Sequence, residues 1–167
     1  MTRKEKKPLS KEEILEKIRH FCAYQERSRL QVMRKLQAIG CGEEDVPAML
    51  EMLAEGNYLN EARFVSQYVR SRASAKGWGP AKIAMALQRE TGENHREEIR
   101  QDDESKMKAL EKLKKDLSKK RGELERKQDP QLREKLLRFC LSRGFAMEDA
   151  LKITEYPGNQ ESSGWAV

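Results

Sequence analysis

The chain has 167 residues, and its 34 lysines and arginines outnumber its 28 acidic residues to give a formal net charge of +6. Charged residues make up 37% of the chain and aromatic residues only 6%, which leaves too few large apolar side chains for one thick core and predicts thin helical layers. No apolar run approaches the roughly 20 residues of a membrane helix, and residues 1–10 lack the apolar stretch of a secretory signal. The three cysteines show no C-x-x-C spacing. We therefore expect a cytoplasmic protein with free thiols.

Three glycines, Gly40, Gly92 and Gly144, recur at intervals of 52 residues, and each closes an amphipathic segment. A few polar residues and then an acidic pair follow each of them. A fixed period of this length indicates one supersecondary unit that is used several times. We therefore expect the same helix pattern in three successive units.

Residues 9–56 are expected to form the first three-helix repeat. Ser10 and Ser28 are each followed three residues later by Glu or Gln, which is the spacing of a capping box at the start of a helix. The second of these helices is expected to end at Gly40. A third helix must begin shortly before Pro47, because proline is tolerated only in the first turn.

Residues 57–101 repeat the same pattern. Asn60 is expected to cap the first helix of this repeat, and the Gly-Trp-Gly sequence at 77–79 is expected to break it. Pro80 then stands at the favoured first position of the next helix. Asn94, with Glu three residues later, predicts the cap of a short third helix.

Residues 102–156 are expected to form the third repeat, with a longer first helix between about Glu104 and Lys127. Asp129-Pro130 is expected to start its second helix, which Gly144 ends. No strand alternation appears, so the predicted fold is all-α: three tandem three-helix repeats in an elongated body, straight or curved. The remaining residues are expected to form a basic N-terminal tail and a flexible C-terminal tail, 1–8 and 157–167.

The sequence offers little that could carry catalysis. His20 and His95 have no Cys, Asp or His at ligand spacing, so we assign no metal, and no glycine-rich phosphate loop is present. The cysteines lie on or beside apolar stripes and are expected to be small buried hydrophobic residues. Acidic pairs lie in first helical turns, where they complement the helix dipole. We therefore expect neither an enzyme nor a bound cofactor.

Basic residues crowd the first two helices of the second repeat, with almost no acid before Glu90: Arg63, Arg70, Arg72, Lys76 and Lys82. This density predicts an electropositive face that meets either a phosphate backbone or an acidic protein groove. Residues 106–127 are also basic, but acidic residues interleave there, which favours a solvated helix face with i,i+4 pairs. Trp78, near the basic face, fits packing in the turn better than base stacking.

At this point the motifs resemble those of the RecX family of recombinase regulators, over about residues 9–156. The departures from the family pattern are Cys140, where an aliphatic residue is usual, and one extra residue between Leu87 and Gly92. The residues that carry the resemblance are 26–30, 35–36 and 40 in the first repeat, Phe64, Arg70, Arg72, 77–80, 82–83, Leu87 and Gly92 in the second, and 135–139 with 142–145 in the third.

This resemblance implies a regulator in DNA repair and homologous recombination that binds the RecA recombinase filament on single-stranded DNA. Such a regulator modulates, and mostly inhibits, ATPase and strand-exchange activity by occupying the filament groove or by blocking extension. We expect a monomer, and direct contact with single-stranded DNA is left open. The residues expected to contact the filament or nearby phosphates are Arg70, Arg72, Lys76 and Lys82, with Arg138 and Arg143 as a second patch.

Two alternative interpretations stay open. Three-helix units with short turns also resemble helix-turn-helix modules, so the chain could be a stand-alone DNA-binding protein, in which Lys82 and the pair Gln88-Arg89 could reach bases. It could also be a purely structural helical adaptor for an acidic protein. The basic face is denser than a scaffold requires, which favours the recombinase regulator over the adaptor.

Overall fold

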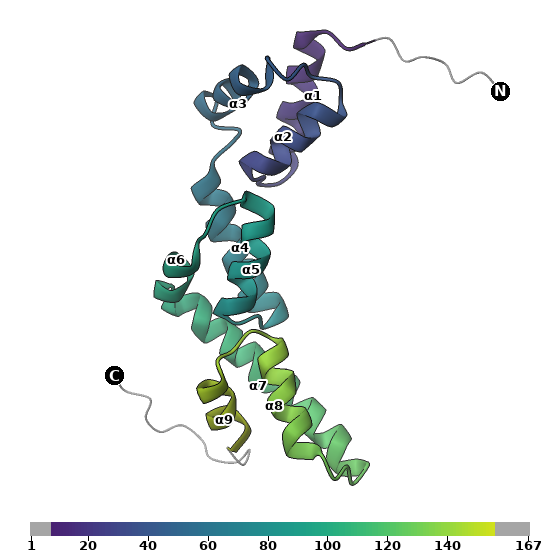
Figure 1. Ribbon diagram of the computed structural model, residues 1–167, viewed down its shortest axis with the longest axis vertical. Helices are drawn as coiled ribbons and strands as arrows, with labels where there is room; N and C mark the ends of the chain where they lie inside the picture. Colours follow the sequence, from purple (N-terminus) through teal and green to yellow (C-terminus); the bar gives the residue numbers. More distant parts are fainter. Residues whose placement is uncertain (1–7, 156–167) are drawn as a thin grey trace, which may run out of the picture. The chain divides into compact units, whose positions relative to one another are not determined.

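The computed structural model describes residues 8–155, and within this range every regular element is an α-helix, as the sequence predicts (Figure 1). The predicted tails lie outside the described residues, except for Pro8. The helices, in chain order, are α1 Lys11–Tyr24, α2 Arg29–Ala38, α3 Val46–Glu55, α4 Glu61–Lys76, α5 Pro80–Thr91, α6 Arg96–Gln101, α7 Asp103–Arg126, α8 Leu132–Ser142 and α9 Met147–Glu155.

The described chain divides into two compact units. Unit 1 contains residues 8–68 together with 87–93, and unit 2 contains residues 69–86 together with 94–155. The division falls within α4, after Tyr68, and within α5, after Ala86. The boundaries of the three predicted repeats stay a prediction.

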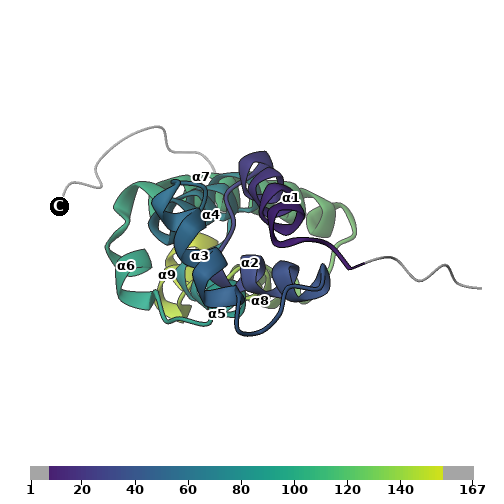
Figure 2. The same ribbon diagram turned by 90° about the horizontal axis from the view of Figure 1, so that it is seen from above.

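Unit 1 is built on the first three helices, with α1 packed against α2 and α2 packed against α3 (Figure 2). The predicted capping boxes are confirmed, because Ser10 and Ser28 each accept a backbone N–H three residues ahead and have their own N–H capped in return. Asp45 is the N-cap of α3, so Pro47 lies in the first turn, where its missing N–H costs nothing. The core of these helices contains Ile14, Ile18, Cys22, Val32, Leu36, Cys41, Val46, Met49, Leu50, Leu53 and Leu59.

Unit 2 contains a hairpin of α7 and α8, and α9 packs against α8. Helix α8, the predicted second helix of the third repeat, begins at Leu132 and not at Asp129-Pro130 as expected. The reason is that the Asp129 carboxylate accepts the Gln131 N–H in a turn before the helix. The third helix of the second repeat likewise begins at Arg96 with His95 as N-cap, while the Asn94 side chain accepts the Arg96 N–H. The buried cluster of the hairpin contains Leu113, Leu117, Leu124, Leu136, Cys140 and Ala150.

The three cysteines are buried and free, as the sequence predicts. Burial raises the pKa of the Cys140 thiol to about 11, and it also raises the pKa values of Cys22 and Cys41. A raised pKa leaves little thiolate near neutral pH, and the thiolate is the reactive form. The three cysteine side chains therefore act as buried packing residues and not as reactive thiols.

Gly122 lies inside α7 with open space where a side chain would project. We expect Gly122→Ala to raise the free energy of unfolding by about 1 kcal/mol, because alanine has the higher helix propensity and meets no neighbour within 4 Å. Equilibrium urea unfolding followed by circular dichroism measures this change. An unchanged or lower free energy of unfolding would contradict the prediction.

Candidate partner-binding site

The candidate site is built on the Gly-Trp-Gly loop that joins α4 to α5 in unit 2. Gly77 has a φ of +59°, a left-handed conformation that ends α4, and its N–H donates to Ala73 O at 3.0 Å. Trp78 N then donates to Arg72 O at 3.2 Å. Pro80 opens α5 at a position where a backbone N–H has no helical partner. The loop therefore turns within three residues.

Three cationic side chains surround the Trp78 ring. The guanidinium carbon of Arg72 and the ammonium nitrogen of Lys76 each lie 5.4 Å from the ring centroid, and the ammonium nitrogen of Lys82 lies 4.9 Å from it. The negative face of an aromatic ring attracts cations at these distances. Arg72, Lys76, Trp78 and Lys82 are called the Trp78 cluster below.

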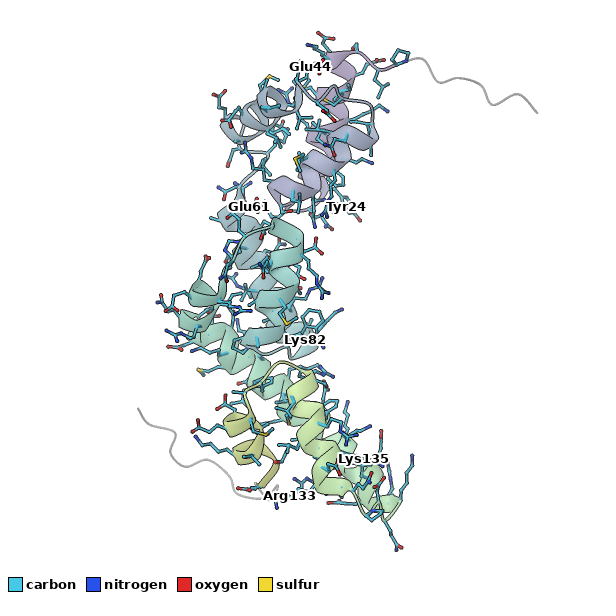
Figure 3. All side chains as sticks on the ribbon, viewed as in Figure 1. Tyr24, Glu44, Glu61, Lys82, Arg133 and Lys135 are labelled. Atoms are coloured by element: carbon cyan, nitrogen blue, oxygen red, sulfur yellow. The ribbon has the colours of Figure 1, made fainter. Side chains whose placement is uncertain are left out.

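The turn after α8 holds this loop in place. Gly79 N donates to Arg143 O at 2.7 Å, Ala81 N donates to Gly144 O at 3.3 Å, and the Lys82 ammonium donates to Ser142 O at 2.8 Å (Lys82 is labelled in Figure 3). Ser142 is the last residue of α8 and Arg143 is its C-cap, so their carbonyls have no partner within the helix, and these donors satisfy them together with the carbonyl of Gly144. A Cβ on Gly79 would lie 2.6 Å from Gly144 O, so only glycine fits here.

Arg143 links the same turn to α4 and α7. Its guanidinium donates to Lys76 O and lies 3.3 Å from a carboxylate oxygen of Asp116, while the Lys112 ammonium lies 2.8 Å from the other oxygen of that carboxylate. The side chains of Arg143 and Asp116 are only 23% and 17% exposed. The hydrogen bond from Lys112, together with the charge of Arg143, holds the pKa of Asp116 below its ordinary value despite partial burial. Asp116 is therefore a carboxylate that fixes two cations.

The structure brings together some of the sequence-predicted residues and leaves others elsewhere. Arg72, Lys76 and Lys82 meet at Trp78, whereas Arg143 is committed to internal contacts beneath the loop. Arg70 is exposed on α4 and acts on Glu104, whose pKa is lowered mainly by Lys108 and further by Arg70. Arg138 forms a separate exposed ion pair with Glu134.

Sequence reasoning missed the roles of Asp116 and Lys112. Their i,i+4 spacing was a signal for the pair itself. The partnership of Asp116 with Arg143 had no local signal, because it depends on how the α7–α8 hairpin closes. Within residues 8–155, no cluster of three or more His, Cys, Asp and Glu side chains is arranged to hold a metal ion, and no helix is both long and apolar enough to span a bilayer.

The Trp78 cluster lies in a stretch that matches a known domain family. The matched family is described as RecX, second three-helix domain, and the match covers residues 60–90. Those residues contain α4, the Gly-Trp-Gly loop and nearly all of α5. The match thus falls on the part of the chain where the sequence motifs were most distinctive.

Longer similarities agree with this match. A regulatory protein RecX of Pseudomonas putida is 33% identical over 127 residues, which cover 75% of this chain and 79% of the relative, and one of Pseudomonas entomophila is 35% identical over 128 residues with the same coverage. In fold, the chain is similar to the crystal structure of RecX from Lactobacillus salivarius, with 19% identity, a TM-score of 0.72 and coverage of 86% of this chain and 94% of that one. A second crystal structure of a regulatory protein RecX gives 18% identity and a TM-score of 0.69, with coverage of 87% and 73%. The three-helix architecture, the motifs around Trp78 and these similarities together establish that this chain belongs to the RecX family of regulatory proteins.

Proposed function

We propose that this chain binds the RecA recombinase filament on single-stranded DNA and modulates it, mostly by inhibiting its ATPase and strand-exchange activities. The observation that carries the proposal is the Trp78 cluster, three cations held around one ring inside the stretch that matches the RecX family. The partner surface would be acidic groups on the recombinase. Membership in a family of regulatory proteins supports this role and favours action by occupancy over catalysis.

The geometry of the cluster suits a docking surface. Three backbone or ammonium donors anchor the loop to the turn after α8, and the ring restrains the three cationic side chains. Groups that are already ordered lose less conformational entropy on binding than free side chains. Opposite charges across an interface also speed encounter and reject wrong partners. The cluster would therefore bind an acidic protein groove with little rearrangement.

Charge reversal in the cluster tests the proposal. We expect Arg72→Glu/Lys76→Glu to raise the concentration needed for half-maximal inhibition at least tenfold, about 1.4 kcal/mol, because two attractive contacts become repulsive. The measurement is the single-stranded-DNA-dependent ATPase rate of the cognate recombinase over a titration of each variant. Circular dichroism of the variant checks that the helices remain.

The matched control reverses two exposed cations of unit 1, Lys17→Glu/Arg34→Glu, and changes the net charge equally. It is expected to inhibit like the unaltered chain. Inhibition by the Arg72/Lys76 variant at the unaltered level would remove the Trp78 cluster from the contact. An ATPase rate that the unaltered chain leaves unchanged at several-fold excess over the recombinase would overturn the proposed function itself.

A further inference from the structure

The exposed side of α7 carries a line of cations. Its members follow the helix at i, i+4, i+7, i+11 and i+18, a spacing that places them on one face over about 27 Å. The buried residues of the same helix include Ala109, Leu113, Leu117 and Leu124, which form a seam on the opposite side. The five cations, called the α7 stripe below, are Lys108, Lys112, Lys115, Lys119 and Arg126.

Basic and acidic residues alternate along residues 106–127 of the sequence, but in the helix the cations of the stripe fall on one line and the acidic residues fall beside it. No acidic residue occupies the line of the stripe between Lys108 and Arg126; the acids of that stretch lie to either side of it. Lys108 pairs with Glu104, and Lys112 pairs with Asp116. Among the ion pairs of residues 8–155, none involves the other three members, Lys115, Lys119 and Arg126, and all three are exposed. The composition alone favours a solvated face of paired charges. In the folded helix two of the five cations are held in such pairs, and the three exposed cations Lys115, Lys119 and Arg126 stay outside any ion pair of the described residues.

From this arrangement we propose that the α7 stripe binds the phosphate backbone of single-stranded DNA directly, without a recombinase. The first four cations recur every three to four residues, about 4.5 to 6 Å along the helix axis, and Arg126 follows seven residues later, about 10.5 Å further on. This spacing fits a partner whose negative charges also recur along a line. A phosphodiester chain has one charge per nucleotide and releases counterions when lysines and arginines neutralise it. A compact acidic protein surface offers no such regular line.

The straightness of the stripe favours a single strand over a duplex. A flexible strand can lie along a 27 Å helix face, about eight nucleotides at B-form spacing, whereas each strand of a duplex winds away from a straight line. The stripe also reaches the Trp78 cluster, because the stem of Lys112 packs on Gly77, where a Cβ would lie 3.0 Å from Lys112 Cγ. Single-strand binders combine a basic track with an aromatic ring for stacking, and Trp78 is half-buried at this end.

The test uses the full chain with no recombinase present, so its result is independent of the proposed function. Fluorescence anisotropy of a labelled oligothymidylate is measured over a range of salt concentrations for the unaltered chain and for Lys115→Gln/Lys119→Gln/Arg126→Gln. Glutamine removes the charge and has a helix propensity close to that of lysine and arginine, and the three residues are exposed, so the fold is retained. The control, Lys17→Gln/Arg19→Gln/Arg34→Gln, removes three exposed cations of unit 1 and gives the same net charge.

We expect the stripe variant to bind the oligonucleotide at least about tenfold more weakly at low salt, and the slope of log K against log salt to fall in magnitude by about 2, since each contact contributes about 0.7. The control is expected to keep the affinity and slope of the unaltered chain. Equal losses in the two variants would assign binding to net charge and overturn the proposal, as would an unaltered chain that does not bind. Tighter binding of the unaltered chain to the matching duplex would overturn the choice of a single strand.

Discussion

Gly144→Ala is expected to destabilise unit 2 by about 4 kcal/mol. Gly144 has a φ of +89°, a conformation that costs an L-residue about 1 to 2 kcal/mol. Its Cβ would also lie 2.5 Å from Lys82 N and still closer to Lys82 Cβ, so the α4–α5 loop would have to move off the turn after α8. Overpacking against backbone adds typically 1 to 3 kcal/mol. Urea unfolding measures the total.

Two other glycines allow the cost of a positive φ to be measured without the cost of a steric clash. Gly40 and Gly92 have φ values of +89° and +82°, but a Cβ on either would meet nothing within 4 Å. We expect their alanine variants to lose only the conformational cost, about 1 to 2 kcal/mol. Hydrogen exchange adds a local readout, because Gly79 N–H and Ala81 N–H should lose protection in Gly144→Ala alone. Equal destabilisation at all three positions would show that the loop contact adds nothing.

The second large effect is expected for Ser28→Ala in unit 1, at about 2.5 kcal/mol. Ser28 is fully buried and caps α2 by accepting the Gln31 N–H, while its own hydroxyl donates to Glu90 O at 2.5 Å. Loss of an N-cap costs about 1 kcal/mol. The Glu90 carbonyl would lose its donor as well. An unsatisfied buried acceptor costs about 1 to 3 kcal/mol, and this partly buried hydrogen bond falls in the lower half of that range.

Ser10→Ala is the matched control, because Ser10 forms the same capping box at the exposed start of α1 and caps nothing from another helix. It is expected to lose only about 1 kcal/mol. Thermal and urea unfolding of the two variants give the difference. If Ser28→Ala cost no more than Ser10→Ala, the hydrogen bond to Glu90 O would contribute nothing to stability.

The Ser28–Glu90 contact in unit 1 and the Lys82–Ser142 contact in unit 2 are similar hydrogen bonds. Glu90 and Ser142 are 52 residues apart, the period of the repeat, and each offers its carbonyl near the end of a helix. In unit 1 the donor is the Ser28 hydroxyl at the start of α2, and in unit 2 it is the Lys82 ammonium at the start of α5. The period in the sequence thus has a structural counterpart, a helix end that receives donors from the first turn of an earlier helix.

The local features of this protein followed from the sequence alone. Capping boxes at Ser10 and Ser28, the cap at Asn60, the break at 77–79 and the proline at the start of α5 are all present where they were predicted. Each of these features depends on side chains that reach backbone groups within a few residues, so spacing in the sequence fixes them. The all-α fold was predicted from these local patterns taken one after another along the chain, and the resemblance to the RecX family came from motifs in the same segments.

The tertiary structure decided which cations are available for binding. Arg138 and Arg143 are both basic residues of the third repeat in the sequence, yet one forms an exposed pair with Glu134 and the other lies beneath the loop with Asp116 and Lys76 O. The α7 stripe likewise became visible only when the helix had a buried side. A sequence records the number and sign of charges, but burial and long-range partners, which arise from how the helices close on one another, set whether a charge faces outward or is neutralised within the protein.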